Sequence, residues 1–324
     1  MLSLKSKAFC IVLFMLLSAC ARQPDDRVWP ARNITIIVPF KPGGGFDLQA
    51  RMLAPFLEKY LPNKINVVIE NVDGASGKMG AVRVARSSPD GYTIGVIGLE
   101  SVAFMRVAGQ LTEDPQQWTW LGQLGSDPLL AAASSASGFK SPADMKGKDF
   151  RFGVTGEMLP SAAILCRTVG ARFRPVHFDG SGDAVLASIR GDIDTWVFSL
   201  PTAVKGVRDS QNKVVPLFVV SKARVPSIPD VPTLAELGVA VEDGVYAVGA
   251  VSRVIAAPPG LDPRVREVLS SAIDRAVHDA AFVEQMKHAE FEVVPASPDD
   301  IRARIKAAVE EFTRAEITTV ADAR

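Results

Sequence analysis

Three consecutive glycines follow an apolar stretch near the start of the chain, and this junction constrains the fold more than any other feature. Residues 34–38 read Ile-Thr-Ile-Ile-Val, Gly43, Gly44 and Gly45 come soon after, and Asp47 is placed to open a helix. Glycine adopts backbone angles that other residues avoid and has no side chain, so such a loop can turn bare N–H groups toward a ligand. A following helix adds the positive end of its dipole. The junction predicts either a plain strand-to-helix turn or an anion-binding loop.

The composition suits a globular protein with ample core and two domains, since 48% of the 324 residues are apolar and 22% are charged. Lysine plus arginine equals aspartate plus glutamate at 36 each. No overall electrostatic field therefore favours nucleic acid or an anionic membrane surface as a partner. The ligand has to be inferred from local motifs.

The first twenty residues have the pattern of an export signal. Two lysines precede an uncharged stretch over residues 8–17, which is too short to span a bilayer. The stretch ends in Leu-Ser-Ala-Cys at Cys20, which is similar to the lipobox of bacterial lipoproteins. Cleavage after Ala21 is the alternative, and it would leave an exported protein without a lipid. We expect a signal peptide over residues 1–19, lipidation at Cys20 and a tether over residues 20–31.

Cysteine usage indicates a fold without disulfides. The chain has three cysteines, of which Cys10 leaves with the predicted signal and Cys20 is the predicted lipidation site. Cys166 then stands alone, in an apolar helical stretch, where a buried thiol is expected rather than a reactive one. Such a fold depends on its hydrophobic core, which this length can supply.

Strand-like and helix-like segments alternate along the chain, as in a doubly wound sheet. The predicted strands cover residues 34–38, 66–70, 92–97, 150–154, 174–178, 195–198 and 214–220. Two weaker segments, residues 118–132 and 246–255, resemble crossings between two α/β lobes. We therefore predict a first lobe of residues 32–124 and 250–324 and a second lobe of residues 125–249. Loops after the parallel strands should converge, because ligands bind beyond the carboxyl ends of such strands.

Helix starts are marked by local signals. Asp47 is the predicted N-cap of a helix with apolar residues at helical spacing. Thr233 and Glu236 predict a capping box for a short helix. Asp262 and Pro263 predict the start of a long helix.

Several motifs together resemble one family. They are Pro-Phe-Lys-Pro-Gly-Gly at 39–44, Glu-Asn at 70–71, Ser-Pro-Asp-Gly-Tyr-Thr at 88–93, Gly-Ser-Gly at 180–182, Gly-Asp-Ile-Asp at 191–194, Ser-Leu-Pro-Thr at 199–202, Pro-Asp-Val-Pro-Thr at 229–233 and Ala-Pro-Pro-Gly at 257–260. In this order they are similar to a Bug (TctC-type) protein, the extracytoplasmic substrate-binding component of tripartite tricarboxylate transporters. The similarity covers nearly the whole chain from residue 34 to the last helix.

The resemblance implies an α/β, two-lobed periplasmic-binding-protein fold of the type II, Venus-flytrap kind, each lobe a mainly parallel sheet flanked by helices. It implies a monomeric, non-enzymatic binding protein without cofactor or metal, in the periplasm or cell envelope. Its expected partners are a small organic carboxylate, membrane transporter subunits and the membrane itself through a lipid at Cys20, with no nucleic acid. A sensor that docks on a signalling partner is the alternative, and a cleft enzyme with Asp47 or Glu100 as general base is a further one.

The resemblance, together with departures from it, predicts a ligand site shared by both lobes. The predicted residues are Phe40, Gly43, Gly44, Gly45, Phe46, Asp47, Gly98, Glu100 and Ser101 in the first lobe, and Thr155, Glu157, Ser161, Gly180, Ser181, Gly182, Phe198 and Ser199 in the second. Backbone N–H groups near Gly44, Gly45 and Ser101 are expected to hold the carboxylate, and Thr155, Ser181 and Ser199 the far end of the ligand. Neutral N–H groups can bind an anion without burying a permanent cation.

Departures from the family bear on the ligand. Glu100 lies where relatives usually carry small hydroxyl residues, and Phe198 replaces an aspartate common in relatives. Glu157, Asp179 and Asp183 add acids to loops of the second lobe. Two interpretations stay open: the pocket takes a ligand with a cationic or hydroxylated end, or the acids face solvent. Phe46 is likewise expected to form either a wall of the site or a cap on the lobe surface.

Other chemistries find little support in the sequence. A Walker motif at residues 72–79 would need glycine and a hydroxyl residue where Val72 and Met79 stand. His177, His278 and His288 lack the close spacing of metal ligands, and the last two are expected to face solvent. The tryptophans at 118, 120 and 196 are expected in the core.

Overall fold

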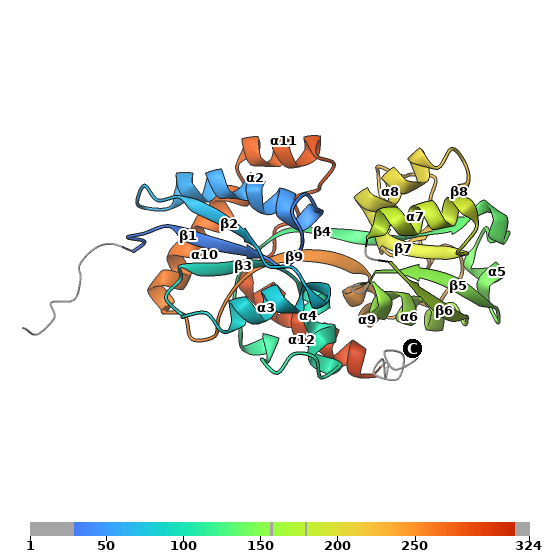
Figure 1. The fold of residues 1–324 in the computed structure, drawn as a ribbon, viewed down its shortest axis with the longest axis horizontal. Coiled ribbons are helices and arrows are strands. Elements are labelled where there is room, and N and C mark those ends of the chain that lie inside the picture. The colour runs from blue at the N-terminus through green and yellow to red at the C-terminus, as the bar shows by residue number, and fades with distance from the viewer. Residues whose placement is uncertain (1–28, 156–157, 179, 315–324) are drawn as a thin grey trace, which may run out of the picture.

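The computed structural model describes residues 29–155, 158–178 and 180–314, and these form two lobes side by side (Figure 1). Strands and helices alternate in both lobes, which confirms the predicted α/β class. The strands are β1 (Ile34–Val38), β2 (Val67–Asn71), β3 (Thr93–Gly98), β4 (Thr119–Ser134), β5 (Asp149–Val154), β6 (Arg172–His177), β7 (Thr195–Ser199), β8 (Val214–Val219) and β9 (Ala250–Ala257). The helices are α2 (Gly45–Tyr60), α3 (Lys78–Ala85), α4 (Leu99–Val107), α5 (Pro142–Met145), α6 (Leu159–Thr168), α7 (Ser181–Arg190), α8 (Leu200–Asp209), α9 (Asp243–Val248), α10 (Pro263–Val277), α11 (Ala280–His288) and α12 (Pro298–Arg314).

One sheet runs through both lobes, because β4 belongs to each of them. The strand order is β2-β1-β3-β9-β4-β7-β5-β6, with β8 also paired to β4. Up to Pro128, β4 pairs with β9 in the first lobe, and from Leu129 it pairs with β7 in the second. The strand β9 begins at Ala250, opposite Pro128, so both crossings lie at the same place.

The parallel strands of both lobes run toward these crossings. The strand β9 leaves the crossing into the first lobe, and β3 is antiparallel to it, so β3 and its parallel neighbours β1 and β2 end near the crossing. In the second lobe β4 leaves the crossing, and β7 is antiparallel to it while β5 and β6 run parallel to β7. The carboxyl ends of both strand sets therefore face each other, which is the arrangement that builds ligand sites in α/β proteins.

Helices cover both faces of the first-lobe sheet. The helices α2, α10 and α11 pack on one face and α3, α4 and α12 on the other (Figure 1). The enclosed side chains include Trp118, Trp120 and, in the second lobe, Trp196, all at most 3% exposed, which confirms their predicted place in the core. Cys166 is also buried, as predicted, and burial raises the pKa of its thiol.

Two predicted helix starts differ from the structure. The N-cap of α2 is Gly44, and Asp47 lies inside the first turn, because its carboxylate reaches back to the glycines instead of capping. Thr233 and Glu236 do form both bonds of a capping box, but they close only a turn. At α10 the prediction is confirmed, since Asp262 is the N-cap and Pro263 the first residue.

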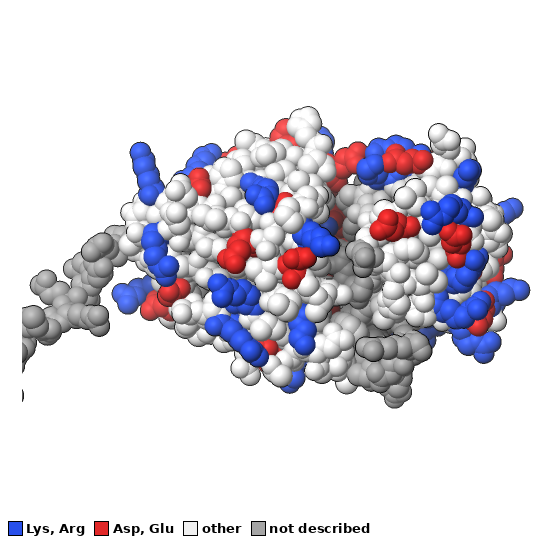
Figure 2. Space-filling model, in the orientation of Figure 1, with Lys and Arg blue, Asp and Glu red and all other residues white. Residues whose placement is uncertain are grey.

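Side-chain ion pairs join the two lobes away from the sheet. At its carboxyl end α12 lies against the second lobe, where Glu311 is 3.6 Å from Arg167 and Arg314 is 2.6 Å from Glu242. Basic and acidic side chains are interspersed over both lobes on the face shown in Figure 2.

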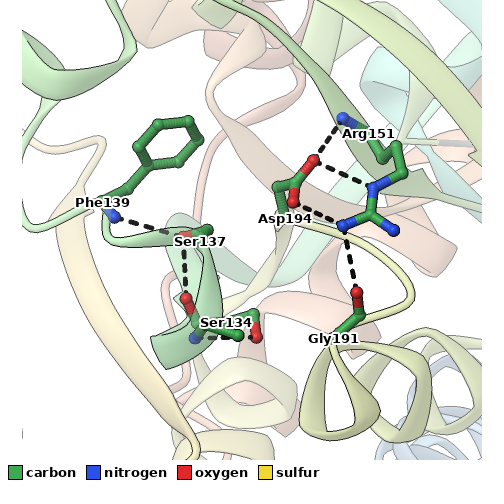
Figure 3. Close-up of polar contacts among 7 residues, drawn as sticks. Ser134, Ser137, Phe139, Arg151, Gly191 and Asp194 are labelled. Carbon is green, nitrogen blue, oxygen red and sulfur yellow. Dashed lines mark hydrogen bonds and ion pairs between the residues drawn. The ribbon is translucent and has the colours of Figure 1, made fainter.

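The far end of the second lobe is fixed by a separate ion pair. Arg151, on β5, binds both carboxylate oxygens of Asp194 at 2.7 and 3.1 Å and also donates to the Gly191 carbonyl (Figure 3). Burial on its own raises the pKa of Asp194, but the bonds and charge of Arg151 outweigh it, so the pKa lies below its usual value. Since Asp194 precedes β7, this pair lies at the end of the strands remote from the crossings.

Candidate functional site

Three loops meet at the carboxyl ends of β1, β2 and β3. They surround a small hollow that opens to solvent. The residues lining it are Pro39 and Phe40 after β1, Ser76, Gly77 and Ala81 after β2, and Ile97, Gly98, Ser101, Val102 and Met105 at β3 and α4. The structure thus brings together three of the predicted site residues, Phe40, Gly98 and Ser101. We call residues 39–44, which join β1 to α2, the glycine loop.

The Asp47 carboxylate holds the glycine loop in place through hydrogen bonds. Its side chain is 2% exposed and accepts hydrogen bonds from the Gly43 N–H at 2.9 Å, from Arg51 Nε at 2.9 Å and from Asn71 Nδ2 at 3.0 Å. Asn71 also donates to the Phe40 carbonyl at 3.0 Å. One carboxylate therefore joins the loop, the first turn of α2 and the end of β2.

These contacts set the protonation of Asp47. Burial on its own raises the pKa of this carboxyl, but the bonds from Arg51, Gly43 and Asn71, with the charge of Arg51, outweigh it and lower the pKa. Asp47 is therefore an anion whose oxygens are already bonded. This arrangement suits a structural clamp better than a general base, which needs a free oxygen near its substrate.

The first turn of α2 presents unpaired donors. Leu48 makes the first intrahelical bond, to the Gly44 carbonyl at 2.9 Å. The preceding N–H groups, at Gly44, Gly45, Phe46 and Asp47, find no partner among the residues that the structure describes. A helix of 16 residues adds its positive dipole end at this point. These four donors, just past the carboxyl end of β1, are the arrangement that binds anions at helix starts.

A second helix, α4, starts beside the first. Gly98 is its N-cap, and a Cβ atom at Gly98 would lie 2.9 Å from Ser101 Oγ and 3.4 Å from the Phe46 ring. A side chain at Gly98 would therefore crowd the Ser101 hydroxyl and the Phe46 ring. The Ser101 hydroxyl makes no hydrogen bond within the described part of the chain, so it is available to a ligand in the hollow.

Glu100 turns away from the hollow and into the first lobe. Its side chain is 9% exposed and accepts from the Ser252 N–H at 2.9 Å and the Ser252 hydroxyl at 2.7 Å. Arg304, on α12, lies 3.6 Å from it. Burial raises the pKa of Glu100, and the charge of Arg304 and the bonds from Ser252 offset this only in part. The carboxylate therefore joins α4 to β9 and α12.

The two phenylalanines of this region pack on each other. The ring centroids of Phe40 and Phe46 are 4.7 Å apart, and Phe46 is 6% exposed. On its other side Phe46 meets the guanidinium of Arg253, 5.0 Å from the ring centroid. Phe46 is therefore a buried side chain in contact with both Phe40 and Arg253, whereas Phe40 lines the hollow.

The second-lobe candidates lie at the carboxyl ends of β5, β6 and β7. Thr155 follows β5, and its buried hydroxyl has no partner within the described residues. Gly180, Ser181 and Gly182 form the start of α7, and the two glycines face open space. Ser199 ends β7 and donates to Thr202 at 3.2 Å.

Two further second-lobe candidates point inward. Ser161 donates to the Val248 carbonyl at 3.0 Å, which ties α6 to α9. The Phe198 side chain is 3% exposed and packs against Trp196, with ring centroids 5.2 Å apart. Glu157, the predicted signal, Cys20 and residues 20–28 of the predicted tether lie outside the described residues. The last three tether residues, 29–31, are described and bind the first lobe, where the Trp29 indole donates to the Asp90 carbonyl and the Ala31 N–H to the Tyr92 hydroxyl.

A buried arginine beside the glycine loop was missed in the sequence. Arg253, on β9, is 4% exposed and forms an ion pair with Asp127 on β4. A Cβ atom at Gly45 would lie 3.2 Å from its Nη2. Only neutral N–H donors were predicted to hold the carboxylate, and Arg253 was not among the predicted site residues. An arginine within the apolar run at 250–257 was the available signal, because charged residues are seldom buried unless they are paired.

Comparison with known proteins places this geometry in a family. The model of the tripartite tricarboxylate transporter family receptor, TctC, matches residues 149–316, more than half of the chain. The chain belongs to this family. Protein BugT of Bordetella pertussis is 28% identical over 308 residues, which cover 91% of each chain. The sequence-based assignment to the Bug (TctC-type) proteins is thus confirmed.

Solved TctC-type structures have the same fold. MatC from Rhodopseudomonas palustris, solved with bound malate, has a TM-score of 0.72 and 25% identity, covering 89% of this chain and 99% of that one. A TctC solute-binding protein from Polaromonas, solved with no ligand, has a TM-score of 0.71 and 23% identity over 89% and 99% of the two chains. The two-lobed periplasmic-binding-protein fold is therefore confirmed.

Members of the TctC family and its structural neighbours are substrate-binding proteins and not enzymes. Within residues 29–155, 158–178 and 180–314, no cluster of three or more His, Cys, Asp or Glu side chains has the form of a metal site. His278 and His288 are 60% and 78% exposed, as predicted. The described helices include none with the length and apolar character to cross a bilayer.

Proposed function

We propose that this TctC-family protein captures a small organic carboxylate between its lobes through backbone N–H groups at the starts of α2 and α4, and delivers it to a tripartite tricarboxylate-type transporter. The supporting observation is the set of unpaired donors from Gly44 to Asp47, at the end of the glycine loop whose residues Pro39 and Phe40 line the hollow together with Gly98 and Ser101. MatC, the relative with bound malate, supports a carboxylate as the ligand class. In the second lobe Thr155, Ser181 and Ser199 take the far end of the ligand.

The strength of such a site is adequate for transport. A hydrogen bond to a charged group contributes about 1.5–3 kcal/mol, so three N–H bonds supply roughly 5–9 kcal/mol. A micromolar dissociation constant corresponds to about 8 kcal/mol. The glycine loop can therefore supply much of the required affinity, and closure of the second lobe supplies the rest.

We further propose that the chain is exported and held at the membrane by a lipid on Cys20, with residues 20–28 as a tether that ends where Trp29 binds the first lobe. The lipobox-like sequence supports this, and the family consists of periplasmic binding proteins. Metabolic labelling with a fatty acid tests it: incorporation into the wild type and none into Cys20→Ser is expected. Equal labelling of both would contradict it.

Gly44→Val tests the proposed N–H site. Gly44 has φ −80° and ψ 169°, and the nearest atom to a Cβ there is the Lys41 carbonyl oxygen at 3.8 Å, so the loop accepts a side chain without strain. We expect the variant to fold normally but to lose carboxylate binding at least tenfold, because valine methyl groups stand before the donors. Gly44→Ala should lose less. The measurement is thermal stabilisation by a panel of carboxylates, which amounts to about 2.7 kcal/mol when ligand is at 100 times its dissociation constant. Undiminished affinity in both variants would refute the site.

A further inference from the structure

Arg253 is buried, but few of its guanidinium N–H groups have hydrogen-bond partners. Its Nη1 donates to Asp127, while Nε is buried without any partner among the described residues. Its Nη2 likewise has no hydrogen bond within the described chain. An arginine has five N–H donors, and leaving them unpaired away from water is costly. A site with spare donors of this kind is built to receive an acceptor.

The surroundings of Arg253 also call for an anion. Its Nη2 lies 3.2 Å from where a Gly45 Cβ would stand, at the first residue of α2. A positive side chain next to the positive end of a helix is unfavourable unless negative charge lies between them. Asp127 supplies one negative charge, but on the Nη1 side of the guanidinium. On the Nη2 side, toward Gly45, the guanidinium makes no hydrogen bond within the described chain, and the Phe291 ring packs beside it.

Two aromatic rings and a buried glutamine surround the Arg253 guanidinium. The rings of Phe46 and Phe291 lie 5.0 and 5.5 Å from the guanidinium carbon. Gln49, one turn beyond Gly45 on α2, is completely buried, and neither polar atom of its side chain has a partner in the described residues. Its Oε1 is 3.7 Å from where a Cβ of Gly125 would lie, and Gly125 is the residue that pairs with Arg253 across the strands. Unsatisfied polar groups thus gather on one face, beneath the first turn of α2.

We propose that Arg253 is the cationic half of the carboxylate site, with Asp127 as its counter-ion, and that a bound carboxylate accepts hydrogen bonds both from the first N–H groups of α2 and from the guanidinium N–H groups that Asp127 leaves unpaired. This inference rests on the proposed function and adds a residue that selects charge: the site favours an anionic ligand over its neutral isostere. In the ligand-free protein Asp127 limits the cost of burying Arg253. Once a carboxylate is bound, Asp127 competes with it for the same cation.

The two members of the pair should therefore have opposite effects on binding. In Arg253→Gln the charge that attracts the ligand is lost, and affinity should fall about 10- to 100-fold, the range for one charge-assisted bond. In Asp127→Asn the competing anion is lost, and affinity should rise several-fold. A pair with a purely structural role would give weaker binding in both variants. Arg253→Lys keeps the charge and should restore part of the affinity.

The experiment uses the purified protein and acetate, malate, adipate, citrate and the uncharged diamide of malate as probes, with affinity measured by calorimetry. The matched controls are Arg151→Gln and Asp194→Asn, which break an Arg–Asp pair remote from the crossings and should leave affinity within twofold. If Arg253→Gln unfolds because Asp127 is left unpaired, the double variant Arg253→Gln with Asp127→Asn removes both charges and should fold but bind weakly. Equal affinity of the double variant and the wild type, or parallel losses in the two single variants, would overturn the inference. Failure of every acid to bind the wild type would instead refute the carboxylate site, and this inference with it.

Discussion

Replacing Asp47 by asparagine should loosen the glycine loop and weaken ligand binding together. The buried carboxylate holds Gly43, Arg51 and Asn71 through the bonds described above. Asparagine keeps one acceptor, so the Gly43 bond can survive, but its NH2 group then meets a donor from Arg51 or Asn71. The loss of one charge-assisted bond costs about 1.5–3 kcal/mol. Because Arg51 is half exposed, its guanidinium can turn to water, so we expect a total near 2–3 kcal/mol rather than the larger cost of stranding a buried charge.

The dependence of stability on pH tests the same contact. Since the folded-state pKa of Asp47 is lowered, its contribution to stability is present above the unfolded pKa near 4 and is lost as the pH falls through the folded value. Urea unfolding, followed by tryptophan fluorescence at pH 7 and at steps below pH 4, should show a smaller loss of stability on acidification in Asp47→Asn than in the wild type. Asp73→Asn, an exposed acid after β2, removes the same charge and should leave stability and affinity unchanged. If Asp47→Asn has the same stability and affinity as this control at neutral pH, the Asp47 carboxylate does not order the glycine loop.

Two further predictions concern buried groups outside the hollow. Glu100→Gln should leave carboxylate affinity within twofold, since Ser252 and Arg304 occupy the side chain. Because the folded-state pKa of Glu100 is raised, the contribution of this group to wild-type stability falls as the pH rises through that value. In urea titrations the glutamine variant should therefore gain stability relative to the wild type toward neutral pH. A large change in carboxylate affinity would instead place Glu100 in the ligand site. Cys166 should react with a thiol reagent only after unfolding, as followed by mass mapping of its peptide, because burial raises the pKa of the thiol; rapid labelling of the folded protein would show that the helix α6 opens readily.

Local patterns predicted those parts of the molecule that depend on neighbours in sequence. The strand at 34–38, the glycines after it and the Asp262 start of α10 follow from periodicity and backbone preference within a few residues. The capping-box residues Thr233 and Glu236 show the limit of this approach. Their bonds form, yet Gly238 takes a positive φ of 76° and ends the turn before a helix can grow.

The parts that could not be predicted depend on pairing between distant segments. Asp127 and Arg253 are brought together only because β4 and β9 are neighbours in the sheet. Glu100 could equally well have faced the hollow, and its inward turn depends on Ser252 and Arg304 from two other elements. Asp47 was predicted as the N-cap of α2, whereas its carboxylate binds Asn71 from β2, so its role as a clamp could not be predicted from neighbouring residues.

The shared strand β4 also determines when this protein can fold. The sheet of the first lobe is completed by β9 and covered by α10 and α12, which come from the last quarter of the chain. During synthesis the N-terminal strands therefore lack their sheet and helix partners until residue 257 and the following helices have been made. Contacts between such distant segments form slowly, because the chain loses the entropy of closing a long loop before the contacts contribute any favourable energy. The topology thus delays completion of the first lobe until the last quarter of the chain is present.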